Sequence, residues 1–194
     1  MRSNQRLGIA NTITIIRILL IPVFMAFLLS KGVLSALSIN IQWGVAIAGI
    51  IFIVAALTDT LDGYLARSRG EITVVGQLLD PLADKLLISA ALISLIGLGR
   101  LSAWIGMVII GREFAVMGFR MTAAVKHIVI PASRLGKFKT ISQIIAISSL
   151  MLRLPWTRLQ TGLEWTLLAI AITLTIASGV EYFTHYWSIL FEDV

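Results

Sequence analysis

Six long apolar segments follow one another along the chain, and short polar stretches separate them. A helix needs about 20 residues to cross the hydrocarbon core of a bilayer, and the segments are close to that length. Because nearly all side chains within each segment are apolar, the pattern predicts membrane spans rather than helices with one buried face. The predicted spans are residues 9–29, 43–65, 78–98, 103–125, 138–154 and 163–187.

The predicted fold is all-α: a polytopic membrane protein with six transmembrane helices and a short N-terminal interfacial segment. We expect a single domain over residues 1–194, because no soluble domain, low-complexity tract or internal repeat interrupts the pattern. The composition agrees with this fold. Only 13% of the residues are charged, whereas soluble domains carry about 25%, so the lipid bilayer must be the main solvent.

The basic residues predict the orientation of the chain. Six spans place both termini on one side, and that side collects eight Lys and Arg residues against four on the other. By the positive-inside rule the richer side is cytoplasmic. We expect an integral protein of the inner cell membrane. The net charge of +6 then reflects orientation and anionic lipid, so we expect no nucleic-acid partner.

Four aspartates lie within 26 positions, at the end of the second predicted span and the start of the third. Asp59 and Asp62 are three residues apart and therefore share a helix face. Asp80 and Asp84 are four apart and share a face in the same way. The link between the two spans is short, so we expect antiparallel neighbours whose aspartate pairs face each other near the cytoplasmic side.

Four ionised carboxylates in that space would repel one another unless protons, nearby cations or metal ions offset their charge. The chain has no cysteine, which excludes thiolate ligands, and oxygen-only ligation fits hard cations such as Mg²⁺ or Mn²⁺. Two divalent ions about 3.5–4 Å apart would clamp a pyrophosphate. The alternative, surface aspartates at helix ends, fits a single interfacial aspartate better than four on matched faces.

Small residues accompany the aspartates. Gly63 and Ala66 leave room for a nucleotide to approach the helix backbone. Small residues also allow helices to pack closely in membranes, and taken alone the two positions favour this second interpretation.

The same stretch resembles the signature of the CDP-alcohol phosphotransferase family. It reads Asp59-Thr-Leu-Asp62-Gly63-Tyr-Leu-Ala66-Arg67 and then, after eight residues, Gly76-Gln-Leu-Leu-Asp80-Pro-Leu-Ala-Asp84. The signature fixes eight residue identities over 26 positions, and all eight are present. The resemblance implies a six-helix membrane fold, usually a homodimer, with a polar cavity that faces the cytoplasm.

The resemblance also implies roles for the aspartates. Asp59, Asp62 and Asp80 would hold metal, and Asp84 would be both a ligand and the catalytic base. The residues that we expect at the CDP site are Asn11, Thr14, Asp62, Gly63, Ala66, Arg67 and Gly76.

The first predicted span carries polar residues on one face. Asn11, Thr14 and Arg17 follow one another at intervals of three residues. A charged residue within a span is costly and normally faces a cavity inside the bundle, where Arg17 would meet a phosphate or a carboxylate. The alternative, an Arg17 that snorkels to the membrane surface, accounts less well for the aligned trio.

Basic residues in the fourth and fifth predicted spans suggest an anion site. Arg112 and Arg120 lie just over two helical turns apart on a similar face, whereas the neighbours Arg112 and Glu113 should point to different faces and not form a simple pair. Lys137 and Lys139 open the fifth span, where their charge adds to free N–H groups of the helix terminus. The alternatives are pairing with other helices for the arginines and the positive-inside bias for the lysines.

These stretches resemble the phosphatidylglycerolphosphate synthase branch of the family, whose acceptor carries its own phosphate. Arg112, Arg120, Lys137 and Lys139 would bind that phosphate. The resemblance implies transfer of the phosphatidyl group of CDP-diacylglycerol to glycerol 3-phosphate. The alternatives are a sister enzyme acting on inositol phosphate, serine or phosphatidylglycerol and, from another class, a cation transporter that uses the carboxylates.

Overall fold

The computed structural model describes residues 9–69, 74–126, 128, 130, 133–152 and 157–191. These residues contain seven helices and no β-strand. The helices are α1 (Ile9–Leu29), α2 (Lys31–Ala36), α3 (Ile41–Arg69), α4 (Val74–Gly97), α5 (Ala103–Val125), α6 (Arg134–Met151) and α7 (Thr157–Phe191). The chain divides into two compact units, Met1–Arg100 and Leu101–Val194.

The all-α prediction is confirmed, and each of the six predicted spans coincides with a long helix. The predicted bounds of α5 agree with the observed ones, while α3 and α7 continue beyond the apolar residues because a helix does not end where its hydropathy falls. The sequence analysis missed α2, a short helix whose N-cap Ser30 accepts a hydrogen bond from the N–H of Val33 at 3.2 Å. The predicted interfacial segment lies outside the described residues.

Two helical stretches of the described chain are long and apolar enough to cross a membrane, Thr12–Leu29 and Thr161–Trp187. A shorter apolar stretch covers Trp43–Thr58. The predicted count of six spans is therefore not confirmed by length and hydropathy alone. The reason is visible in α5 and α6, each of which carries three charged residues that lower its hydropathy.

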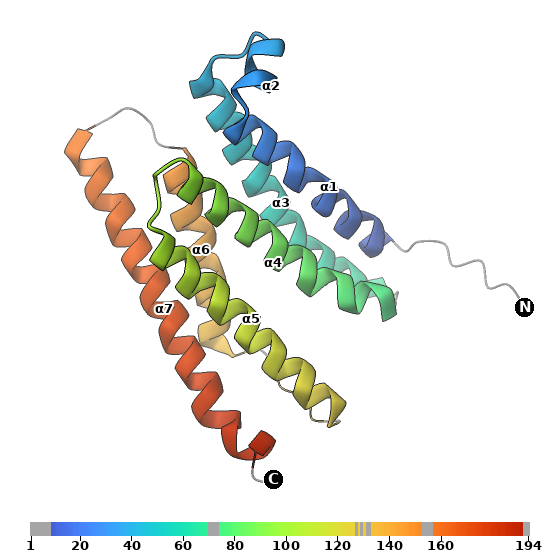
Figure 1. Ribbon diagram of the computed structural model, residues 1–194. Coiled ribbons are helices and arrows are strands. Elements are labelled where there is room, and N and C mark those ends of the chain that lie inside the picture. The colour runs from blue at the N-terminus through green and yellow to red at the C-terminus, as the bar shows by residue number, and fades with distance from the viewer. Residues whose placement is uncertain are drawn as a thin grey trace, which may run out of the picture. The chain divides into compact units, whose positions relative to one another are not determined.

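In the first unit, α1 packs against both α3 and α4. The rings of Phe24 and Phe52 meet edge to face, with centroids 6.3 Å apart, and both side chains are fully buried. Figure 1 shows α3 and α4 running in opposite directions, as predicted from the short link between them. Antiparallel packing brings the last turns of α3 close to the first turns of α4, which are the turns that carry the aspartates.

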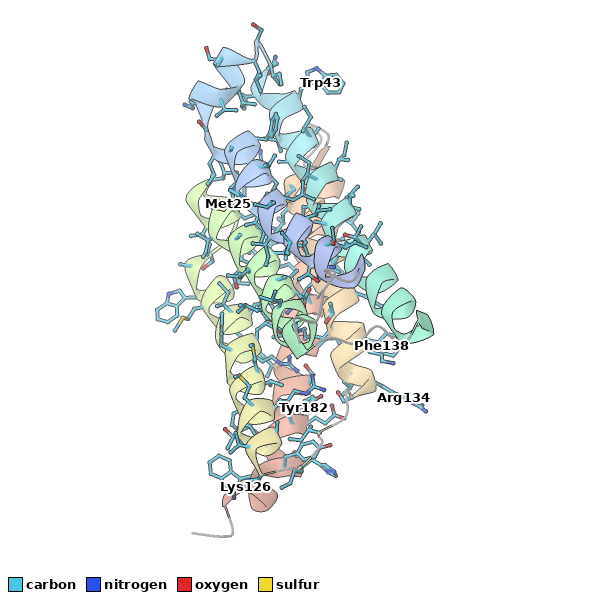
Figure 2. The ribbon with its side chains drawn as sticks, turned by 90° about the vertical axis from the view of Figure 1, so that its right-hand side faces the viewer. Met25, Trp43, Lys126, Arg134, Phe138 and Tyr182 are labelled. Atoms are coloured by element: carbon cyan, nitrogen blue, oxygen red, sulfur yellow. The ribbon has the colours of Figure 1, made fainter. Side chains whose placement is uncertain are left out.

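The close approach of α1, α2 and α3 depends on Gly44. A Cβ at this position would lie 2.5 Å from a methyl group of the buried Leu34 and 3.1 Å from the carbonyl oxygen of Phe27. Just before it, Trp43 projects away from the helices (Figure 2) and is 69% exposed.

In the second unit, α7 packs along both α5 and α6. Toward the C-terminal end of α7, Tyr182 joins Val116, Ala123 and Ile130 in a buried cluster. Phe119 packs against this cluster and against Phe183, with ring centroids 4.7 Å apart. The packing fixes α5 and the connection after it against α7.

Candidate active-site residues in the two units

The predicted metal and nucleotide residues lie in the first unit. Asp59 and Asp62 belong to α3, Asp80 and Asp84 belong to α4, and these two helices contact each other. Most of their side chains are outside the part of the chain that the structure describes, and their predicted roles stay predictions. The predicted site residues concerned are Asn11, Asp59, Asp62, Gly63, Ala66, Arg67, Gly76 and Asp80.

Asp84 is the aspartate whose side chain is described. Its Oδ2 lies 3.2 Å from Nζ of Lys85, and the two side chains are 21% and 19% exposed. The ion pair accounts for Lys85, one of the basic residues that lie within a predicted span. Because the pair is only partly buried, the Asp84 carboxylate is still accessible to a substrate.

Thr14 and Arg17 are both buried on α1, with 1% and 2% of their surface exposed. This confirms that they share an inward face, while Asn11 lies outside the described side chains. The snorkelling alternative for Arg17 is wrong, because a snorkelling side chain would reach the surface. A buried guanidinium in an apolar helix is costly, so it normally faces the interior of the helix bundle.

In the second unit, one buried carboxylate holds two cations. Glu113 on α5 is 3% exposed, and its Oε1 pairs with Nζ of Lys139 on α6, which is 2% exposed. The same oxygen lies 3.3 Å from Nη1 of Arg112. The expectation that Arg112 and Glu113 do not pair is therefore wrong, because the long arginine side chain bends round the helix to its neighbour.

A row of polar residues on α7 continues this cluster. Nη2 of Arg112 donates a hydrogen bond to Oγ of Ser178 at 2.9 Å, and Nε2 of Gln143 donates to Oγ1 of Thr175 at 2.9 Å. Gly179 leaves room for the arginine, since a Cβ there would lie 3.2 Å from Cγ of Arg112. The sequence analysis did not single out this row, although its residues recur every three to four positions within an apolar helix.

The four predicted acceptor cations occupy different environments. Lys139 is buried against Glu113, whereas Lys137 is exposed, because residues two apart on a helix do not share a face. Arg120 is exposed, and its Nη2 donates to the carbonyl oxygen of Ile130 at 3.0 Å. The side chain of Arg112 is 12% exposed. The structure thus brings Arg112 and Lys139 together at Glu113, and phosphate binding by the four residues stays a prediction.

The described side chains contain no group of three or more His, Cys, Asp or Glu residues that could hold a metal ion. The donor chemistry of the α3 and α4 aspartates nevertheless fits a divalent ion, because carboxylate oxygens are the ligands that hard cations prefer. The helices also place these positions on adjoining elements.

Together, these features define an all-helical class of protein with aspartates on two adjoining helices and charged side chains buried among apolar ones. Residues 7–177 match the CDP-alcohol phosphatidyltransferase family, and the chain belongs to this family. The family consists of membrane-associated enzymes of lipid biosynthesis that generally use divalent metal ions.

Curated relatives resemble the chain over most of its length. A Bacillus subtilis protein named CDP-diacylglycerol–glycerol-3-phosphate 3-phosphatidyltransferase is 44% identical over 187 residues, which cover 94% of this chain and 97% of the relative. A Rickettsia felis protein of the same name is 34% identical, with 91% and 93% covered. A probable phosphatidylglycerophosphate synthase of Mycobacterium tuberculosis is 38% identical, with 90% and 79% covered.

The buried pair makes a prediction about stability. Glu113→Gln removes the negative charge and leaves two cations without it, and breaking a buried pair typically costs about 3–5 kcal/mol. We expect a clear fall in the thermal midpoint of the detergent-purified protein, measured by tryptophan fluorescence. Glu181→Gln on the exposed face of α7 is the matched control and should leave the midpoint unchanged.

A double variant tests whether the effect comes from the pair. Glu113→Gln combined with Lys139→Gln removes both charges, so its loss should be smaller than the sum of the two single losses. If Glu113→Gln and Glu181→Gln have the same thermal midpoint, the carboxylate of Glu113 does not stabilise this unit.

Proposed function

We propose that this protein transfers the phosphatidyl group of CDP-diacylglycerol to glycerol 3-phosphate, giving phosphatidylglycerol phosphate and CMP. The observation that carries the proposal is the 44% identity to a relative named for this reaction, over 97% of that relative. The family match over residues 7–177 supports the reaction type. The cations of the second unit support a phosphate-bearing acceptor, since serine and phosphatidylglycerol offer no comparable phosphate monoester.

The proposal includes an inner-membrane location with six spans, a site that faces the cytoplasm, and a homodimer. Large apolar side chains on the outside of the helices support the membrane environment. Trp104 and Val125 are each 81% exposed and Trp43 is 69% exposed, which water would disfavour and lipid or a membrane interface accommodates. Arg112 and Glu113 of α5 and Lys139 of α6 face partners within their own unit, as spans with internal charges require.

We propose that two Mg²⁺ or Mn²⁺ ions bind at Asp59, Asp62, Asp80 and Asp84. The support is the oxygen-only donor set on two adjoining helices together with the use of divalent ions in the family. When bound, the ions supply positive charge that stabilises the pyrophosphate and the leaving group. The small residues Gly63, Ala66 and Gly76, with Asn11, Thr14 and Arg67, would form the cytidine nucleotide site.

Asp84 is the proposed base. Its carboxylate takes the proton of the 1-hydroxyl of glycerol 3-phosphate as that oxygen attacks the β-phosphorus of CDP-diacylglycerol. A new P–O bond forms, the bond from the β-phosphorus to the bridging oxygen breaks, and CMP leaves with the bonding electrons. Lys85, whose ammonium lies 3.2 Å from Asp84, orients the carboxylate for this role.

The second unit would bind the phosphate of the acceptor. Arg112, Arg120 and Lys137 are the cations that a phosphate can reach, because each has exposed surface. Lys139 is buried against Glu113, so we assign it mainly to holding α6 against α5. Charge-assisted hydrogen bonds from the three exposed groups would select a phosphate over a hydroxyl.

The proposed reaction can be tested with purified protein, CDP-diacylglycerol, Mg²⁺ or Mn²⁺, and a panel of acceptors. Mass spectrometry should detect phosphatidylglycerol phosphate and equimolar CMP with glycerol 3-phosphate, and at most slow transfer to serine, inositol phosphate or glycerol. Excess EDTA should abolish turnover, and either divalent ion should restore it. Equal use of serine would reject the acceptor, and full turnover in EDTA would reject the metal site.

The base assignment predicts that binding and turnover separate in one variant. Asp84→Asn should lose turnover, because the base is removed. It should keep CMP binding within about tenfold, because three aspartates still hold a metal ion although one ligand charge is lost. Calorimetry measures the binding, and the transfer assay measures the rate. Asp59→Asn is the comparison and should weaken both. A near wild-type rate for Asp84→Asn would show that another group accepts the proton.

A further inference from the structure

Tyr182 on α7 is buried at the point where three segments of the second unit meet. It is 5% exposed and packs with Val116 and Ala123 of α5 and with Ile130 of the connection that follows α5. Figure 2 shows Tyr182 within the helices of this unit, whereas Arg134 and Phe138 at the start of α6 project outward. No sequence pattern singled out this residue, since a tyrosine in an apolar helix is usually part of the core.

The ring of Tyr182 contacts two of the proposed acceptor cations. Cζ of Arg112 lies 5.9 Å from the ring centroid, and Cζ of Arg120 lies at the same distance. Both distances are within the range of an attractive cation–π contact. Since the arginines are eight residues apart on α5, their side chains must converge to reach one ring.

The hydroxyl of Tyr182 reaches the third segment. Its oxygen accepts a hydrogen bond from the backbone N–H of Ser133 at 3.3 Å. Ser133 is the N-cap of α6, and its own Oγ accepts from the N–H of Gly136 at 3.0 Å. Tyr182 therefore fixes the start of the helix that carries Lys137, while its ring holds the two arginines.

The chemistry of the ring suits cations that must still bind an anion. A carboxylate partner neutralises a cation, as Glu113 does for Lys139. An aromatic ring attracts a guanidinium through its quadrupole and leaves the net charge in place. Arg120 and Arg112 both lie against this ring. Arg112 also shares the Glu113 carboxylate with Lys139, and two cations on one carboxylate keep a net positive charge for a phosphate.

We propose that Tyr182 is a positioning residue for the phosphate of the acceptor, which it serves by holding Arg112, Arg120 and the N-terminus of α6 as one preformed anion site. This inference rests on the proposed function, because it assigns the phosphate of glycerol 3-phosphate to these groups. Preorganisation reduces the entropy that binding would otherwise cost. The effect should therefore appear in the binding of the acceptor and not in the binding of the lipid nucleotide.

The test compares Tyr182→Leu, which removes the ring, with Tyr182→Phe, which removes only the hydroxyl. Tyr182→Leu should raise KM for glycerol 3-phosphate about tenfold, the size expected when two cation–π contacts are lost. KM for CDP-diacylglycerol and kcat at saturating substrates should stay within about twofold. Tyr182→Phe should raise the acceptor KM about threefold, since the N–H of Ser133 loses one neutral hydrogen bond.

Inorganic phosphate provides a readout that a purely structural role would not change. As a competitor of glycerol 3-phosphate, it should show a Ki that rises in Tyr182→Leu by the same factor as the acceptor KM. Trp165→Leu is the matched control, because this aromatic side chain is 61% exposed and lies 17 residues before Tyr182 on the same helix. It should leave both constants within about twofold.

The outcomes separate this inference from the function on which it rests. A wild-type protein that does not use glycerol 3-phosphate would reject the proposed function. An active wild type with a Tyr182→Leu variant that raises both KM values equally, or lowers only kcat, would overturn the role of Tyr182. If Tyr182→Leu does not give folded protein, Tyr182→Met, which also lacks a ring, supplies the same comparison.

Discussion

The charge arrangement of the second unit depends on the buried carboxylate of Glu113. It pairs with Lys139 of α6 and lies 3.3 Å from Nη1 of Arg112, so it joins two of the three helices of this unit. Arg112 in turn binds Ser178 and thereby links the cluster to α7. Helices in a membrane gain little from burying apolar surface against one another, so polar contacts of this kind help to decide how they associate.

The second unit positions its cations through two kinds of contact, one with a carboxylate and one with an aromatic ring. Lys139 is buried and neutralised, which stabilises the packing but leaves little charge for a ligand. Arg112 and Arg120 rest against the ring of Tyr182, which does not neutralise them. Arg112 also shares Glu113 with Lys139, so this cluster keeps a net positive charge. In the proposed acceptor site, the ring contacts would leave charge for the phosphate, and the buried ion pair would hold the helices beneath it.

Much of the fold could be predicted from the sequence, because the period and length of apolar segments report helices directly. The placement of the aspartates on two adjoining helices was also predictable, whereas their common site stays a prediction. The pairing of Glu113 with Lys139 was not, because it joins residues 26 positions apart on different helices. The contact of Tyr182 was even harder to predict, because its hydrogen-bond partner Ser133 is 49 positions away and no local pattern reveals it.

We propose that the exposed cations of the second unit recognise the phosphate of the acceptor. Calorimetric titration of glycerol 3-phosphate in the presence of CMP and Mg²⁺ tests this most directly, with Lys137→Gln compared with Lys31→Gln on the exposed face of α2. We expect Lys137→Gln to weaken binding about tenfold to a hundredfold, the cost of one charge-assisted hydrogen bond. Lys31→Gln should leave the affinity unchanged. Equal affinity of Lys137→Gln and the wild type would contradict the claim.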